Sequence, residues 1–409
     1  MRDREYSAFM LLNAPGFGAK SIYYVYNNLI KNGLEINDLF ENNFVQLTNL
    51  FPEIGHGKFS RAALSSLQSL DNDLLYSQYQ KLKNENVHII GLDDERYPKL
   101  LHERLGENTP PVLFCKGYLP LLNADSISIV GSRDVGDFAI MLTKRIANRL
   151  ADAGYNVTSG FAKGVDTSAH IGALENNGTT TMVLSYGFNH LSIKKDFKGY
   201  DWEQNTLFIS QFMPYEKFSG QNAMIRNKLV CALSRAVIVI SSGPARYANG
   251  KMSGTFDAGL TAIKYKIPLF VLNPSLLTPS PQGNSDLIKL GGIPLSNGNE
   301  LVQYLDTIAF SPESEKYDSE VKETEELLIH TVEDPGSAYQ TQLNDIKDKI
   351  LNLFNGKPLS IQDIIEQAHL DWTAKKLSSY LKNLDEIEVV KKGGSNFYRR
   401  REPQQRLFT

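Results

Sequence analysis

The stretch Ser159-Gly160-Phe161-Ala162-Lys163-Gly164-Val165-Asp166-Thr167-Ser168-Ala169-His170 carries the strongest structural signal in the chain. It joins a short β-branched run to a segment with helical spacing, and Asp166 or Thr167 is placed to cap that helix. Two glycines and a lysine in the connection suit a phosphate, which backbone N–H groups and a point charge would hold. Glycines are also common in ordinary strand–helix turns. We expect His170 to be a packed, hydrogen-bonded helix residue rather than a catalyst.

The same alternation of short β-branched runs and helical stretches extends from Val87 to about Asp306. It predicts an α/β fold, a Rossmann-like, mostly parallel sheet covered by helices. The expected strands are Val87–Leu92, Val112–Cys115, Ser126–Val130, Asn156–Ser159, Thr180–Ser185, Leu207–Ser210, Ala236–Ile240 and Ile267–Leu272. The expected helices are Ala139–Ala153, Asp166–Asn176, Ala223–Ser234 and Phe256–Lys264.

Four domains or segments are predicted along the 409 residues. Residues 1–84 are expected to form a helical domain like a SAM or helix-hairpin-helix domain, and residues 85–310 the Rossmann-like domain. Residues 311–344 carry nine acidic residues against two lysines, which is typical of a flexible acidic linker. In residues 345–409, three helical stretches and a hairpin around Lys392-Gly393-Gly394-Ser395 predict a winged-helix domain.

Composition and charge favour a cytoplasmic protein with room for a nucleic-acid-binding face. The chain is 42% hydrophobic and 22% charged, without an apolar run long enough for a membrane span or the pattern of a signal peptide. Its two cysteines, Cys115 and Cys231, fit a reducing compartment. The net charge of −3 is concentrated in the linker, so the average conceals possible basic faces.

Several common catalytic motifs are missing from the sequence. It contains no P-loop, no dinucleotide fingerprint after a strand, no nucleophile elbow and no His/Cys set with metal spacing. We therefore predict no catalytic residue, no cofactor and no metal.

Residues suited to an anion follow other predicted strands as well. The carboxyl ends of parallel strands share one edge of a sheet, where ligands of such folds bind. Gly131-Ser132-Arg133 follows Ser126–Val130, and the Arg133 guanidinium suits a phosphate. Arg226-Asn227-Lys228 is expected at the start of a helix, where two cations oppose the helix dipole unless an anion binds. Lys251-Met252-Ser253-Gly254 opens another helix. Each cluster alone is compatible with ordinary surface residues, whereas their convergence predicts a groove for a polyanion.

These motifs, taken in order, resemble the Smf/DprA family. The resemblance begins at Tyr97-Pro98 and Pro110–Gly117 and continues through Ile129–Arg133 and the string from Ser159 to His170. It ends with Arg226-Asn227-Lys228, Ser253-Gly254 and Gly283-Asn284. The string from Ser159 to His170 is its most specific part. The helical N-terminal segment and the winged helix are also features that this family often carries.

The resemblance implies single-stranded DNA binding, a homodimer and delivery of the strand to a RecA-type recombinase, best known from natural transformation. By the same resemblance, Arg133, Lys163, Arg226 and Lys228 would contact DNA phosphates. The full predicted DNA-binding set is Gly131, Ser132, Arg133, Ser159, Gly160, Lys163, Gly164, Arg226, Asn227, Lys228, Lys251, Ser253 and Gly254.

The chain also departs from the family pattern. Ala223-Met224-Ile225 stands where the family usually has Phe-Pro and a variable residue, and Ser210-Gln211 and Ser241-Ser242 replace pairs that carry a carboxylate. Asp134–Phe138 replaces an aromatic–glycine step. These changes indicate a divergent member.

A second hypothesis is a nucleotide sensor or an enzyme similar to nucleoside-monophosphate phosphoribohydrolases, which share this type of fold. That family's Pro-Gly-Gly-x-Gly-Thr-x-x-Glu string has only a partial counterpart here. Ser253-Gly254-Thr255-Phe256-Asp257 lacks the Pro-Gly-Gly start, and its carboxylate comes one position early.

Overall fold

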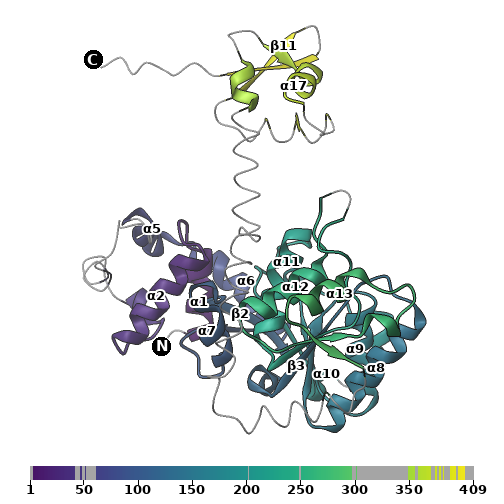
Figure 1. Cartoon of the computed structure of the whole chain (residues 1–409). Coiled ribbons are helices and arrows are strands. Elements are labelled where there is room, and N and C mark those ends of the chain that lie inside the picture. The colour runs from purple at the N-terminus through teal and green to yellow at the C-terminus, as the bar shows by residue number, and fades with distance from the viewer. Residues whose placement is uncertain are drawn as a thin grey trace, which may run out of the picture. The chain divides into compact units, whose positions relative to one another are not determined.

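The computed structural model divides the chain into two compact units, residues Met1–Ser311 and Pro312–Thr409 (Figure 1). It describes residues 3–41, 47, 51, 61–200, 202–247, 250–296, 301, 349–354, 358–369, 374, 377–378, 381, 387–392 and 395–400. The predicted acidic linker, 311–344, lies outside the described residues.

The first unit is built on a sheet with the strand order β1-β2-β6-β5-β4-β3-β7-β8-β9. Within the described residues, the neighbours in the series β6-β5-β4-β3-β7-β8-β9 run parallel, whereas the pairs β1–β2 and β2–β6 are antiparallel. The mostly parallel α/β sheet predicted from the sequence is confirmed. The strands are β1 (His88–Gly91), β2 (Val112–Gly117), β3 (Ser126–Val130), β4 (Asn156–Gly160), β5 (Thr180–Val183), β6 (Thr206–Ser210), β7 (Ala236–Val239), β8 (Leu269–Leu272) and β9 (Ile293–Leu295).

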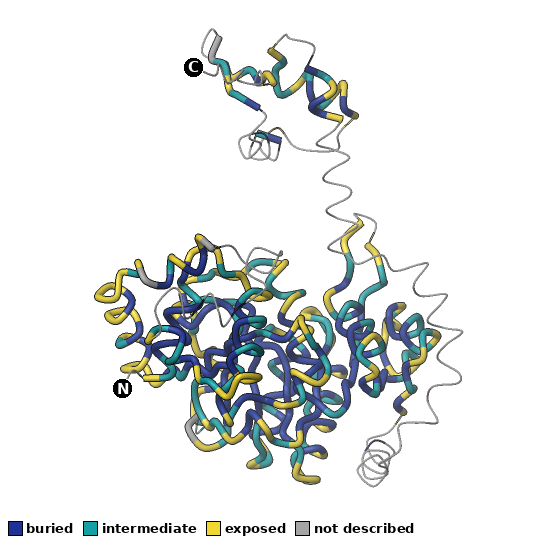
Figure 2. The backbone as a smooth tube through the Cα atoms, turned by 90° about the vertical axis from the view of Figure 1, so that its left-hand side faces the viewer, coloured by how far each residue is buried: buried dark blue, intermediate teal, exposed yellow. Residues whose placement is uncertain are grey.

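Helices cover both faces of this sheet. On one face, α8 (Asp137–Asp152) and α9 (Val165–Glu175) pack their apolar residues on Ile127 and Ile129 of β3. On the other face, α7 (Lys99–Leu105), α11 (Gly220–Ala232), α12 (Gly254–Lys264) and α13 (Gln282–Lys289) pack on Val130 and on neighbouring strands. Successive residues of a strand point to opposite faces, so a fully apolar strand serves two cores at once. The buried centre of the unit is visible as the dark blue trace in Figure 2.

The strand order reverses at β3. Along the chain, β4, β5 and β6 are added one after another on one side of β3. The next strand, β7, then lies on the other side of β3. In open parallel sheets the crevice at such a reversal, outside the carboxyl ends of the strands, is the usual ligand site. The fold therefore predicts a ligand site among the segments that follow β3, β4 and β7.

The N-terminal helices pack against the β1 edge of the sheet. They are α1 (Arg4–Asn13), α2 (Ala19–Lys31), α3 (Asp38–Glu41), α5 (Arg61–Ser66) and α6 (Asn72–Asn84), which agree with the helical character predicted for this segment. The separate domain expected for residues 1–84 remains a prediction. Their buried side chains join Ile89, Val112 and Phe114 in one core.

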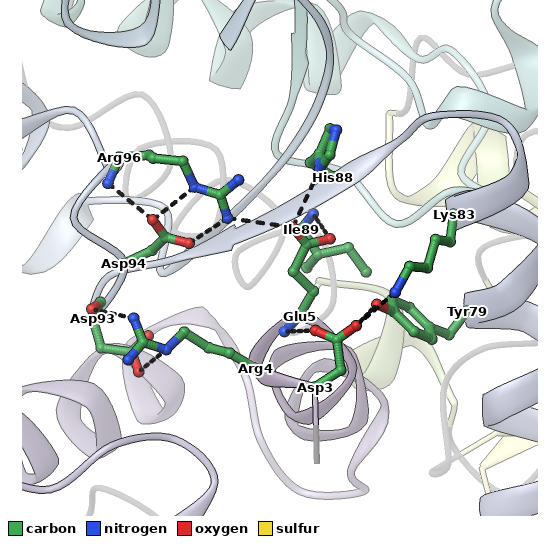
Figure 3. Close-up of polar contacts among 10 residues, drawn as sticks. All are labelled: Asp3, Arg4, Glu5, Tyr79, Lys83, His88, Ile89, Asp93, Asp94 and Arg96. Atoms are coloured by element: carbon green, nitrogen blue, oxygen red, sulfur yellow. Dashed lines mark hydrogen bonds and ion pairs between the residues drawn. The ribbon is translucent and has the colours of Figure 1, made fainter. Parts of the chain in front are cut away.

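A polar junction fixes the start of α1 to α6 and to that edge (Figure 3). Asp3 accepts hydrogen bonds from the Tyr79 hydroxyl at 2.5 Å and from Lys83 Nζ at 2.9 Å. Glu5 Oε2 accepts the backbone N–H of Ile89, in the edge strand, at 3.1 Å. A carboxylate on an edge-strand N–H occupies a group that could otherwise pair with another chain.

The second unit contains a small antiparallel sheet in the order β10-β12-β11. Its described elements are β10 (Leu359–Ser360), α17 (Ile361–Gln367), β11 (Ile387–Lys392) and β12 (Ser395–Arg400), and residues 349–353 are helical. Leu377 and Leu381, in the third predicted helix, are buried with Ile364 and Tyr398. Most other residues of that helix, and the two wing glycines, lie outside the described residues. The winged-helix assignment stays a prediction.

Among the residues that the structure describes, no helix is long and apolar enough to cross a membrane.

Candidate nucleic-acid interface

A cavity of about 340 Å³ opens at the sheet edge where the strand order reverses. Its walls come from the segment after β3, the loop after β4, the middle of α11 and the start of α12. The lining residues include seven of the thirteen predicted DNA-binding residues: Gly131, Ser132, Arg133, Arg226, Asn227, Ser253 and Gly254. These seven residues, which are up to 123 positions apart in the chain, lie together at one cavity. Their positions after the predicted strands implied this convergence.

The segment Gly131-Ser132-Arg133 is held tightly at the mouth of the cavity. Ser132 donates both its backbone N–H (2.8 Å) and its hydroxyl (3.0 Å) to the carbonyl of Ser241, two residues after the neighbouring strand β7. A Cβ on Gly131 would lie 2.5 Å from the Val165 side chain, so only glycine fits between β3 and α9. Arg133 itself is exposed, with its guanidinium 5.5 Å from the centre of the Phe218 ring. This cation is accessible to a ligand.

Arg226 forms the floor of the cavity. It lies six residues after the start of α11 and is buried, with 7% of its side chain exposed. The prediction that it stands at a helix start is wrong, because α11 begins at Gly220, capped by the Ser219 hydroxyl. Arg226 and Lys228 therefore do not oppose the dipole of the helix start, and no anion is needed there to offset them.

The partner of Arg226 is Asp166. Arg226 Nη1 lies 3.7 Å from Asp166 Oδ2, and both side chains are 7% exposed. Burial raises the pKa of the Asp166 carboxyl, and the positive charge of Arg226 opposes that rise. The Nε of Arg226 is buried and has no hydrogen-bond partner among the described residues. A cation in this state is suited to attract an anion placed above it.

The helix that follows β4, α9, begins at Val165, one residue before the predicted start at Asp166. Gly164, with φ +73°, is the residue before α9, and no side chain caps the helix there. Asp166 instead accepts the N–H of Ala162 at 3.3 Å, and Thr167 donates its hydroxyl to the Ala162 carbonyl at 2.6 Å. The predicted capping role of Asp166 or Thr167 is wrong, because both side chains turn back to the loop.

The segment Ser253-Gly254 opens α12 as predicted, although the helix begins at Gly254 and not at Phe256. Ser253 is the N-cap and accepts the N–H of Phe256 at 3.4 Å. Asn227 of α11 donates to the Gly254 carbonyl at 2.9 Å, which fixes the two helices relative to each other at the cavity wall. The helix N-terminus and its positive dipole end face the same space as Arg133 and Arg226.

The six other predicted residues do not line the cavity. Ser159 and Gly160 are buried beneath it, where Ser159 donates its hydroxyl to the Ile129 carbonyl at 2.6 Å. Gly164 is the last residue of the loop before α9. The remaining three, Lys163, Lys228 and Lys251, are exposed and stand within a few residues of lining positions.

His170 is the packed helix residue that the sequence predicted. Its imidazole lies between Thr180 Oγ1 (2.6 Å) and the Gly160 carbonyl (2.8 Å), fully buried. Burial lowers its pKa to about 3, so the ring is neutral. Among the described residues there is also no group of three His, Cys, Asp or Glu side chains placed to hold a metal ion.

Comparison with known proteins agrees with this architecture. Residues 88–306 match the model of the family described as DNA recombination-mediator protein A, which is more than half of the chain. The chain belongs to this family. The resemblance seen in the sequence is thereby confirmed for the Rossmann-like part.

Several relatives are similar over the same region. Protein Smf of Escherichia coli is 28% identical over 226 residues, which are 55% of this chain and 58% of that protein. DNA processing protein DprA of Streptococcus pneumoniae is 29% identical over 235 residues, 57% of this chain and 78% of the relative. The crystal structure of DprA from S. pneumoniae matches with a TM-score of 0.59 at 24% identity, covering 74% of this chain and 98% of that one. The chain therefore spans little more than half the length of the E. coli relative.

Three features of the candidate interface have no local signal in the sequence. Tyr247 lines the cavity and is 46% exposed, yet it follows no recognisable motif. The pairing of Asp166 with Arg226 joins residues sixty positions apart. Lys194, in an unremarkable Lys-Lys pair, contacts the loop after β4 from below.

Proposed function

We propose that this chain binds single-stranded DNA along the cavity edge of its sheet and presents the strand to a RecA-type recombinase. It does so in the cytoplasm, as a homodimer and without catalysing a reaction. The observation that carries the proposal is the convergence of Arg133, Arg226 and the N-terminus of α12 on one cavity at the reversal of strand order. The family's description as a recombination mediator and the names of its DNA-processing relatives support the same conclusion.

The positions of the cations favour two different roles, direct contact with phosphates and support from beneath the cavity. Arg133, Lys163, Lys228 and Lys251 are exposed and can each approach a phosphate along the strand. Arg226 is buried beside Asp166 and adds positive potential from below rather than a surface contact. A positively charged edge that follows a flexible backbone is the general design of proteins that bind single strands with little sequence preference.

The alternative of a phosphoribohydrolase-like enzyme finds less support. Such chemistry needs a carboxylate that faces the bound sugar. Burial raises the pKa of Asp257 to about 6, but Asp257 faces Asn227 Nδ2 at 3.5 Å and is not among the residues that line the cavity. The carboxylates that do line it are Asp134, at the rim, and Asp166, which is paired with Arg226.

The central test is a titration of labelled single-stranded and double-stranded oligonucleotides of equal length at several salt concentrations. We expect preference for the single strand and an affinity that falls steeply with salt, because each phosphate contact releases counterions. Binding should need neither nucleotide nor metal. Equal affinity at low and high salt, or a preference for the duplex, would refute the proposal.

Arg133 offers the sharpest single-residue test. The Arg133→Ala variant should bind single-stranded DNA about tenfold more weakly and lower the salt slope by about 0.7, the value for one phosphate contact on a single strand. Its thermal midpoint should stay within about 1 °C, because the side chain is exposed. Arg149→Ala is the matched control, since Arg149 is an exposed cation in the last turn of α8 and does not line the cavity, and it should leave binding unchanged. A lower midpoint with unaltered affinity would make Arg133 a structural residue.

A further inference from the structure

Lys194 lies beneath the loop that connects β4 to α9. Its Nζ donates to three oxygens of that loop and the following helix: the carbonyls of Phe161 and Ala162, each at 2.9 Å, and the Thr167 hydroxyl at 3.1 Å. The ammonium also lies 4.1 Å from the centre of the Phe161 ring. One cation thus contacts both residues that immediately precede Lys163.

The match between donor and acceptors is complete only for the protonated amine. An ammonium has three N–H donors and no lone pair, and here three oxygens receive them. A neutral amine has two donors and would direct its lone pair at the third oxygen. The ring of Phe161 also attracts the cation but not the neutral group.

The loop held in this way contributes to the candidate interface. Ala162 lines the cavity, and Lys163, which follows it, is exposed. Lys194 itself is not among the residues that line the cavity, and its donors are directed at the loop. From this position Lys194 can support a residue that contacts DNA, but it is not placed to contact DNA itself.

We propose that Lys194 is a positioning residue: its ammonium, without touching DNA, holds the loop Phe161–Gly164 in the conformation from which Lys163 reaches the strand. This inference rests on the proposed single-stranded DNA binding and adds to it a residue and a dependence on pH.

The surroundings of Lys194 place its deprotonation close to neutrality. Burial lowers its pKa to about 8. The carboxylates of Asp166 and Asp196 favour the charged form, whereas Arg226 and Lys163 oppose it, and the nearby His170 is neutral. Because the pKa of Lys194 is lowered, its charge is present at pH 7 and is lost as the pH rises through 8. The support of the loop should therefore weaken between pH 7 and pH 9.

The first experiment is a double-mutant cycle on single-stranded DNA affinity at pH 7, with a fluorescently labelled oligothymidylate as the probe. Lys194→Met and Lys163→Ala should each weaken binding by about tenfold, the scale of a hydrogen bond to a charged group. In the Lys163→Ala background, Lys194→Met should cause little further loss, because the contact that it supports is already absent. Lys195→Met, which removes an exposed neighbouring charge, should change affinity less than twofold.

The second experiment is a pH series from 7 to 9 on the intact protein and on Lys194→Arg. The wild-type affinity should decline, by no more than the loss seen in Lys194→Met, whereas the arginine variant should show no such decline, because arginine stays charged. The arginine variant also keeps a cation in place should Lys194→Met fail to fold.

Two results would overturn the inference while leaving DNA binding intact. One is additive losses from Lys163→Ala and Lys194→Met, which would make Lys194 an independent DNA contact. The other is an equal decline of wild type and Lys194→Arg with pH. Absence of single-stranded DNA binding by the wild type at every pH would instead remove the proposed function itself.

Discussion

Replacing Asp166 with alanine is expected to lower the free energy of unfolding by about 3 to 5 kcal/mol, the usual cost of stranding one member of a buried ion pair. The change would leave the Arg226 guanidinium buried, with its Nε already lacking a partner and its nearest carboxylate gone. It would also remove the acceptor for the Ala162 N–H. Urea denaturation followed by circular dichroism measures the effect as a shift of the midpoint.

The double variant Asp166→Ala/Arg226→Met tests the cause. Methionine fills much of the space without a charge, so the double variant should be more stable than Asp166→Ala alone, as replacement of a whole buried pair by apolar groups often is. Asp134→Ala is the matched control. It removes an exposed carboxylate from the rim of the same cavity and should change stability by less than about 0.5 kcal/mol. If the double variant is no more stable than the single one, the loss does not arise from the unpaired Arg226.

The strands of the sheet could be predicted because their pattern is local. Ser126–Val130 is a β-branched run followed by glycine, and β3 has the same bounds. β9 was not predicted, since it is only three residues long and contains Pro294, which weakens any strand signal. The edge of the sheet at which the ligand residues gather followed from the parallel arrangement alone.

The interior of the site could not be predicted in the same way. The sequence predicts a helix that begins at Ala223, whereas the Ser219 cap starts α11 at Gly220. Arg226 therefore lies on the buried floor of the cavity and not at the predicted helix start. The pairing of Arg226 with Asp166 depends on how α9 and α11, on opposite faces of the sheet, are placed around β4, and the three-oxygen contact of Lys194 depends on the loop 191–199. No periodicity encodes either contact.

Gly164→Ala is expected to destabilise the protein by about 2 to 5 kcal/mol and to weaken DNA binding at the same time. Gly164 has φ +73° and ψ −123°, a conformation that residues with a Cβ rarely adopt. A Cβ there would lie 2.4 Å from the Arg133 carbonyl and 2.7 Å from the Ser132 carbonyl. Both contacts are to backbone, so a side-chain rotation cannot relieve them, and overpacking adds to the backbone strain.

The relief of this clash would change the interface itself. A movement of Ser132-Arg133 away from the start of α9 would make room, and this movement would displace the Arg133 guanidinium from the cavity mouth. Gly220→Ala is the matched control, because a Cβ at Gly220 meets no atom within 4 Å and lies in the first turn of α11. It should leave both the thermal midpoint and the single-stranded DNA affinity unchanged. Gly164→Ala with lowered stability but wild-type affinity would show that the position of Arg133 is not set by its contact with Gly164, and the loop after β3 would then have to be supported from the Ser241 side alone.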